Sequence, residues 1–196
     1  MKAPKFKYIR PSSIGEAISL LSEFGEEARI LAGGQSLLPT LNMRLSQPEV
    51  LIDINRLEEL QGISCEGEQV RIGALTRHVD IAESNLIDEN IPLISEAIKY
   101  VAHVAVRNRG TFGGSVALAD PAAEMPACTL ALQGTVVVEG PNGRRQIRAD
   151  EFFHNLYETA RAPDEILIEV QLPIKRPRES FTFMELSRRK GDYAMA

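Results

Sequence analysis

The sequence predicts an α+β fold, in which helices and antiparallel strand pairs are mixed along 196 residues. Two segments, 63–73 and 135–147, have the pattern of a β-hairpin, because apolar residues alternate on either side of a glycine-containing turn. A third segment, 14–24, carries apolar residues at helical spacing between clear start and stop signals. Hairpins mixed with helices argue against a doubly wound parallel sheet, and 44% hydrophobic residues are enough for a packed core.

The first predicted unit spans residues 1–58 and contains the best-marked helix of the chain. Ser13 and Glu16 form a capping box at the start of this helix, and Gly25 ends it. The expected order is a strand at 6–10, the helix, a strand at 29–32, a helical stretch at 37–45 that Pro39 breaks, and a strand at 50–54. The helix must bury its apolar face on the strands, so we expect a small α+β layer.

The second predicted unit spans residues 59–175, and its helices are placed by their start signals. Thr76 caps one helix, Pro92 opens another that runs to about Val101, and Asp120 is the expected N-cap of a third. The other elements expected here are the two hairpins, a short helical turn at 151–155 capped by Asp150, and a strand at 166–172 with one face in the core.

The third predicted region, residues 176–196, is the start of a C-terminal part. We expect a strand at 181–187, with the Lys and Arg residues between 176 and 190 on its solvated face. The sequence stops without polar tapering, so we expect a further domain to be missing from this chain.

The composition excludes several classes of function. The net charge of −5 gives no electrostatic footprint for nucleic acid. Cys65 and Cys128 lie far apart without C-x-x-C spacing, so the chain offers no disulfide scaffold, metal site or iron–sulfur cluster, and we expect buried thiols in a reducing compartment. Three scattered histidines add no metal-binding pattern. The N-terminus lacks a signal-peptide core and no run approaches the ~18 apolar residues of a membrane span, so we expect a cytoplasmic protein.

Two double-glycine motifs, at 32–36 and 111–115, carry the most information about function. Each follows an apolar stretch and precedes a helix-like one. A glycine pair permits positive φ and lets successive N–H groups converge on an anion, so the two motifs together suggest a diphosphate clamp. The usual nucleotide fingerprints are missing, since no G-x-G-x-x-G follows the first strand and no G-x-x-x-x-G-K-[ST] occurs. The alternative is that both motifs are ordinary turns.

The motifs belong to a larger set of segments that occur in a fixed order. These are Ile30–Leu37, Ile72–Thr76, Arg107–Ser115, Ala119–Glu124 and Ser187–Ala194. The set resembles the FAD-binding medium subunit of the molybdenum hydroxylases, a group that includes carbon monoxide dehydrogenase and the flavin domain of xanthine dehydrogenase. The resemblance covers essentially the whole chain.

This resemblance implies a fold and a set of cofactor contacts. The fold would be the two-subdomain, PCMH-type fold of the vanillyl-alcohol-oxidase and cell-wall-reductase flavoproteins, with FAD between the subdomains and a third, C-terminal domain that this chain lacks. The backbone of two segments would hold the pyrophosphate: Leu31, Ala32, Gly33, Gly34, Gln35, Ser36 and Leu37 in the first, and Thr111, Gly113, Gly114 and Ser115 in the second.

The same resemblance implies contacts to the rest of FAD. Asp120 and Glu124 would lie near the ribityl and adenosine portions, Leu167 would place its backbone by the ring system, and Asp192 and Tyr193 would lie beside the isoalloxazine. The residues alone leave alternatives open, in which the two acids cap a helix, Leu167 is a core residue and Tyr193 packs. The chain departs from the usual pattern at four positions, namely Phe112 for Ile or Val, Ser115 for Asn, Glu124 for Asp and Met184 for Lys.

The implied function is electron transfer. The resemblance places molybdopterin in a large partner subunit and two [2Fe–2S] clusters in a small one, with FAD passing electrons to an acceptor such as NAD⁺, dioxygen or a quinone. No catalytic residue and no metal ligand is nominated in this chain. One alternative is a flavin-free module for phosphate-ligand binding or assembly. Another, a flavin oxidase, would need a covalent-attachment residue, and the only candidate near a glycine motif, His103, has the setting of a buried helix end.

Overall fold

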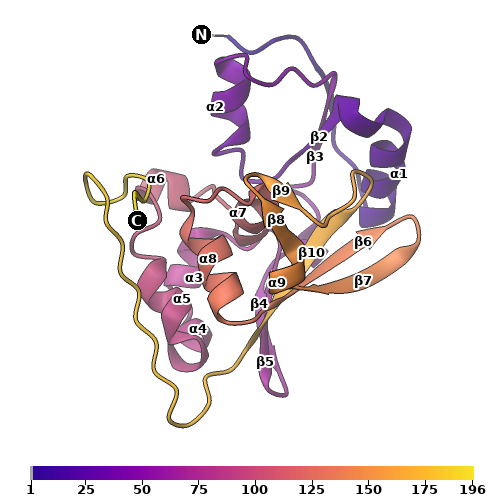
Figure 1. Cartoon of the computed structure of the whole chain (residues 1–196). Helices are drawn as coiled ribbons and strands as arrows, with labels where there is room; N and C mark the ends of the chain where they lie inside the picture. The colour runs from indigo at the N-terminus through magenta and orange to yellow at the C-terminus, as the bar shows by residue number, and fades with distance from the viewer. Residues whose placement is uncertain (1) are drawn as a thin grey trace.

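The computed structural model describes residues 2–196 and contains two main sheets (Figure 1). The first sheet has three strands in the order β1-β3-β2, which are β1 (Lys7–Ile9), β2 (Ala28–Leu31) and β3 (Val50–Asp53). Both outer strands run parallel to β3. The helices α1 (Ile14–Phe24) and α2 (Leu37–Asn42) therefore serve as the crossovers that parallel neighbours require.

Helix α1 forms as the sequence predicts. The Ser13 hydroxyl accepts a hydrogen bond from the Glu16 N–H at 3.1 Å, and Glu16 in turn accepts from the N–H and hydroxyl of Ser12. Gly25 adopts a φ of 51°, a conformation that glycine reaches without steric cost, and it begins a short 3₁₀ turn (Gly25–Glu27). Pro39 does not break α2, because it lies in the first turn, where proline costs no hydrogen bond.

The second sheet is antiparallel, with the strand order β4-β5-β10-β6-β7. Its strands are β4 (Ile63–Glu66), β5 (Gln69–Gly73), β6 (Thr135–Gly140), β7 (Gly143–Arg148) and β10 (Ile166–Pro173). The expectation that β10 buries one face is wrong, because both faces are covered. Leu167 and Leu172 belong to the core on one side, and Ile166 and Ile168 belong to the core on the other.

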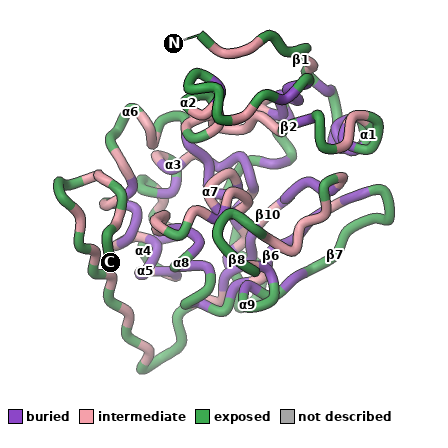
Figure 2. Tube along the Cα trace, turned by 45° about the horizontal axis from the view of Figure 1, so that its top comes forward, coloured by how far each residue is buried: buried purple, intermediate pink, exposed green. Residues whose placement is uncertain are grey.

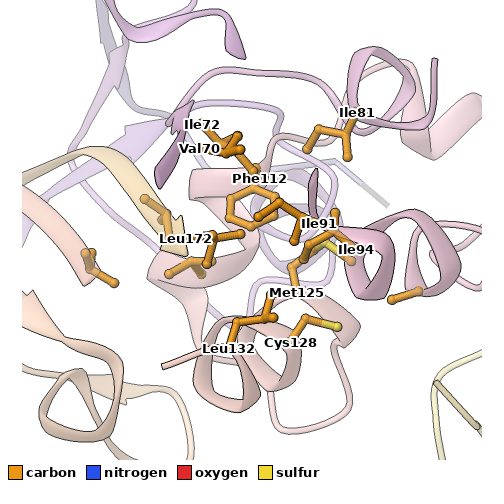
Figure 3. Close-up of a cluster of buried hydrophobic side chains, with 14 of the residues drawn as sticks. Val70, Ile72, Ile81, Ile91, Ile94, Phe112, Met125, Cys128, Leu132 and Leu172 are labelled. Atoms are coloured by element: carbon orange, nitrogen blue, oxygen red, sulfur yellow. The ribbon is translucent and has the colours of Figure 1, made fainter. Parts of the chain in front are cut away.

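The two cores explain how the sheets are held together. One core lies between the antiparallel sheet and a set of helices, with the Phe112 ring at its centre (Figure 3). The other joins α1 and the parallel sheet to the opposite face of β10 and β6, through residues such as Leu21, Ile52 and Val137. Figure 2 shows buried residues along α1 and along β10 and β6. The predicted unit boundary near residue 58 therefore crosses a continuous core, and the division into two units stays a prediction.

The helices that cover the antiparallel sheet are short. They are α3 (His78–Ala82), α4 (Asn85–Asn90), α5 (Pro92–Ala97), α6 (Val104–Arg107), α7 (Phe112–Leu118), α8 (Glu124–Ala131) and α9 (Ala149–Phe152); a 3₁₀ turn (Glu58–Leu60) and a small hairpin of β8 (Phe153–Asn155) and β9 (Glu158–Thr159) complete the fold. None of the helices between residues 2 and 196 has the length and apolar character needed to span a bilayer.

Several local predictions need correction. Asp120 is not an N-cap, because α8 begins at Glu124 and Asp120 instead starts a turn in which its Oδ1 accepts from the Ala122 N–H at 3.0 Å. Helix α3 is preceded by Arg77 rather than by Thr76, and α9 starts at Ala149, ahead of Asp150.

Residues 181–187 form no strand, because this apolar stretch packs on helices instead. The Phe183 ring lies 5.2 Å from the Tyr100 ring, measured between centroids, and the backbone N–H of Phe183 donates to the Glu96 carboxylate at 3.1 Å. The basic residues of 176–190 therefore lie along an extended segment rather than on a strand face (Figure 1).

Candidate functional site

A cavity of about 910 Å³ lies where the end of β2, the start of α7, the start of β10 and the segment 191–193 meet. This volume is in the range of ligand pockets. All the site residues predicted from the sequence except Leu31 line it: Ala32, Gly33, Gly34, Gln35, Ser36, Leu37, Thr111, Gly113, Gly114, Ser115, Asp120, Glu124, Leu167, Asp192 and Tyr193. The structure therefore brings together residues as far apart in the chain as Ala32 and Tyr193.

The first glycine motif offers free hydrogen-bond donors to this cavity. In the described part of the chain, the N–H groups of Gly33, Gly34, Gln35 and Ser36 have no protein acceptor. Gly34 has a φ of 71°, which explains why glycine is required there. Four successive unpaired N–H groups beside a cavity form a concavity that suits an anion.

The second glycine motif differs from the expectation, because its N–H groups are already used inside the protein. The N–H of Phe112 donates to the Thr76 carbonyl at 2.9 Å, and that of Gly113 donates to the Ala74 carbonyl at 3.0 Å. The N–H of Gly114 donates to the hydroxyl of Thr111, the N-cap of α7. The motif is thus the first turn of a helix rather than an open loop.

The glycines of the two motifs serve close packing. A Cβ on Gly113 would lie 2.6 Å from the Ala74 Cα. A Cβ on Gly33 would lie 2.5 Å from the Arg109 carbonyl oxygen and 2.8 Å from the Gly110 Cα. At Gly33 the backbone of the first motif therefore touches residues 109–110, directly before the second motif, and only glycine allows this approach.

The lining also contains the carboxyl groups of Asp120 and Glu124. Burial is the main cause that raises the pKa of Glu124 to about 7, and the nearby carboxylates of Glu185 and Asp120 contribute to the same increase. Within residues 2–196, the buried carboxylate oxygens of Glu185 have no hydrogen-bond partner. Near neutral pH, Glu124 is therefore able to carry a proton and donate a hydrogen bond into the cavity.

Sequence reasoning missed three basic residues of the lining, His78, Arg29 and Arg161. His78 is 5% exposed, and its Nδ1 has no partner among the described residues. Burial lowers its pKa to about 4, and the charges of Arg107 and Arg77 act in the same direction. No spacing pattern marks these residues, since they are brought to the cavity only by the tertiary fold.

Some single-residue expectations are settled by exposure. His103 is exposed at the start of α6, so the expectation of a buried helix end is wrong. Tyr193 is 69% exposed and lies at the cavity, so its ring is not a packing residue. Leu167 is 4% exposed and both belongs to the core and lines the cavity. Of the two thiols expected to be buried, Cys128 is buried and Cys65 is exposed.

Comparison with known proteins gives consistent matches over the whole chain. Residues 4–175 match the family described as the FAD binding domain in molybdopterin dehydrogenase. The carbon monoxide dehydrogenase medium chain of Hydrogenophaga pseudoflava is 44% identical over 196 residues, which cover all of this chain and 68% of that one. Caffeine dehydrogenase subunit beta of a Pseudomonas species is 40% identical, with 99% of this chain and 66% of the relative covered.

Solved structures agree with these relatives. The carbon monoxide dehydrogenase of H. pseudoflava superposes with a TM-score of 0.97 over 99% of this chain and 68% of that chain, at 44% identity. Quinoline 2-oxidoreductase from Pseudomonas putida 86 gives a TM-score of 0.95 over 100% of this chain and 67% of that chain, at 40% identity. These scores confirm the predicted α+β fold, and the chain spans about two thirds of the length of these proteins.

Proposed function

The chain belongs to the family of FAD-binding domains of molybdopterin dehydrogenases, and from this premise we propose that it is the electron-transfer part of a molybdenum hydroxylase. In this proposal, electrons arrive from [2Fe–2S] clusters of a small partner subunit, after a molybdopterin subunit has oxidised the substrate. They leave to an external acceptor such as NAD⁺, dioxygen or a quinone. The names of the relatives, which are subunits of carbon monoxide and caffeine dehydrogenases, support this proposal.

The cavity fits FAD, the cofactor of this family. One observation carries the assignment: four successive unpaired N–H groups, from Gly33 to Ser36, border a cavity that several distant segments build. A diphosphate needs donors of this kind, and uncharged amides supply them without a lysine. The lining also includes the apolar and aromatic surface that a flavin ring requires, from residues such as Leu167 and Tyr193.

Each part of the lining has a defined task in this proposal. The amides of Gly33–Ser36 bind the diphosphate, and Gly33 lets the second motif close against the first. Asp120 and a protonated Glu124 bind hydroxyl groups of the ribityl and adenosine portions. Leu167 places backbone against the ring system, and Asp192 and Tyr193 border its edge.

Bound FAD supplies the chemistry, which is to take up electrons one at a time and deliver two. The chain itself needs no general base or nucleophile, because electron transfer only requires that the cofactor be held and oriented. Tyr193 is an exposed residue of the lining, and we place access for the acceptor on its side of the cavity.

The proposal is tested by titrating the ligand-free chain with FAD, ADP and riboflavin. We expect saturable 1:1 binding of FAD, competition by ADP, which shares the diphosphate, and little competition by riboflavin, which lacks it. Binding of ADP without FAD would instead favour a flavin-free phosphate-binding module. Co-expression with an iron–sulfur subunit and a molybdopterin subunit then tests electron transfer, through substrate-dependent bleaching of the flavin absorbance.

A matched pair of glycine variants sharpens this test. Gly34 and Gly143 both have positive φ, of 71° and 95°, so alanine strains the backbone at either position. Only Gly34 lines the cavity, whereas Gly143 is the first residue of β7 and pairs with Gly140 at the end of the β6–β7 hairpin. We expect Gly34→Ala to weaken FAD binding by about tenfold or more, and Gly143→Ala to leave it unchanged.

A further inference from the structure

Two side chains outside the cavity, Asn55 and Arg77, connect the glycine motifs to each other. Asn55 follows β3 in the first sheet, and Arg77 precedes α3, beyond β5 of the second sheet. The Arg77 guanidinium donates to the Asn55 Oδ1 at 2.6 Å. We call this pair the strap. Neither residue lines the cavity.

The Asn55 end of the strap holds the carbonyl groups of the first motif. Its Nδ2 donates to the Ala32 carbonyl at 2.7 Å and to that of Leu31 at 3.3 Å. Asp53, which is 5% exposed, accepts from both the Nδ2 and the backbone N–H of Asn55, at 2.7 and 2.9 Å. The amide is therefore locked, with its nitrogen facing three acceptors and its oxygen facing the Arg77 donor.

The Arg77 end holds the second motif. Its guanidinium also donates to the Arg109 carbonyl, which precedes Gly110. The backbone around Arg77 is paired with the same stretch: the His78 N–H donates to the Gly110 carbonyl at 3.1 Å, and Arg77 forms an isolated bridge with Thr111. Arg77 is thus bonded to the second motif and the residues just before it, and its guanidinium also contacts Asn55, which binds the first motif.

The strap determines which way the first motif presents its amides. In a trans peptide the C=O and N–H point in opposite directions. The Ala32 carbonyl points to Asn55, so the N–H of Gly33 in the same peptide points away from Asn55. Gly33 lines the cavity, and its N–H has no protein acceptor. If this peptide turned over, a carbonyl oxygen would replace a donor at the edge of the anion site.

We propose that Asn55 and Arg77 are positioning residues that preorganise the diphosphate site, by fixing the Ala32–Gly33 peptide and locking the two glycine motifs together. This inference rests on the proposed function, since the site it prepares is the one assigned to FAD. The cost of binding falls when the donors are held in place before the ligand arrives.

The experiment compares strap variants with matched controls in the 196-residue chain. Asn55→Ala and Arg77→Met each remove one link, and their double variant removes both. Asn90→Ala deletes an amide that donates to the Leu86 carbonyl, and Arg148→Met deletes a guanidinium paired with Asp150; neither control residue lines the cavity. FAD affinity is measured by fluorescence titration, and the mobility of Gly33 and Gly34 is measured in the ligand-free chain by amide NMR relaxation.

We expect each single strap variant to raise the Kd for FAD by about 10- to 100-fold, and the controls to change it by less than about threefold. The double variant should cost no more than the worse single variant, because both links act in series. The order parameters of Gly33 and Gly34 should fall from about 0.85 to below about 0.6. If Arg77→Met does not fold, Arg77→Lys, which keeps the charge and one donor, should give a smaller increase of the Kd.

Unchanged FAD affinity with rigid Gly33 and Gly34 in both single variants would overturn the proposed role of the strap. Additive losses of FAD affinity in the double variant would overturn it as well. If the parent chain does not bind FAD, the proposed function fails, but the relaxation measurement still shows whether the strap holds the Gly33 and Gly34 amides in place. Mobile Gly33 and Gly34 amides in Asn55→Ala alone would support it, and equally rigid amides in the parent and the variant would refute it.

Discussion

Replacing Gly33 by alanine tests the contact that brings the two glycine motifs together. Gly33 does not need a left-handed backbone, so alanine introduces no strain of its own dihedral angles. The effect comes from the added Cβ, which would lie 2.5 Å from the Arg109 carbonyl oxygen and 2.8 Å from the Gly110 Cα. Both neighbours are backbone atoms, which cannot rotate away as the end of a flexible side chain can.

The size of the effect follows from these distances. Relief of the overlap requires the motifs to separate by roughly 1 Å, and overpacking of this kind typically costs about 1–3 kcal/mol of folding stability. The same displacement moves the amides of Gly33–Ser36 relative to the rest of the cavity lining, and so away from the anion that they bind in the proposed function. The loss of one charge-assisted hydrogen bond costs about 1.5–3 kcal/mol, so we expect FAD affinity to fall by about 10- to 100-fold.

Urea unfolding and FAD titration measure the two effects separately. Gly15→Ala is the control, because Gly15 lies in α1 and nothing would come within 4 Å of an added Cβ. We expect this control to be more stable than the parent by up to about 1 kcal/mol and to bind FAD equally well. A Gly33→Ala variant with parental stability and parental FAD affinity would refute the reasoning.

Three further predictions concern groups around the same cavity. The pKa of His78 is lowered from 6.5 to about 4, so the unfolded chain takes up a proton first as the pH falls. Up to about 3 kcal/mol of folding stability should therefore be lost between these two pH values. The urea midpoint of His78→Gln should fall less over this pH interval than that of the parent chain. The pKa of Glu124 is raised from 4.5 to about 7, so its contribution to folding stability is lost as the pH rises through this interval, opposite to that of His78. The melting temperature of Glu124→Gln should fall less over the same pH interval than that of the parent chain. Thr111→Val removes the hydroxyl that accepts from the Gly114 N–H at 3.1 Å, and should cost about 1 kcal/mol in urea unfolding; an unchanged midpoint would show that this cap is unimportant.

The elements that could be predicted are those with local signals. Helix α1 has both of its ends marked by side chains, and the hairpins at 63–73 and 135–147 have a turn between alternating strands, so each matches its prediction closely. The parallel pairing of the first sheet could not be predicted, because strand direction depends on which partner is met in space. Residues 181–187 have the alternation of a strand, but the Phe183 ring packs on the Tyr100 ring and the Phe183 N–H donates to Glu96 of α5.

The candidate site shows the same limit. Nearly all of the site residues that the sequence predicts line the cavity, because the motifs that contain most of them are contiguous and rich in glycine. The motifs do not show that the N–H groups of Phe112 and Gly113 are already bonded to Thr76 and Ala74, since those acceptors lie in a segment more than 30 residues earlier. His78 is missed for the same reason, because a single histidine carries no spacing signal.

The central claim is that the amides of Gly33–Ser36 bind the diphosphate of FAD. The most direct test follows the amide NMR resonances of the chain during titration with FAD. The account predicts that the resonances of Gly33, Gly34, Gln35 and Ser36 shift downfield and saturate at the same FAD concentration as the fluorescence signal. Saturable FAD binding that leaves these four resonances in place would contradict it.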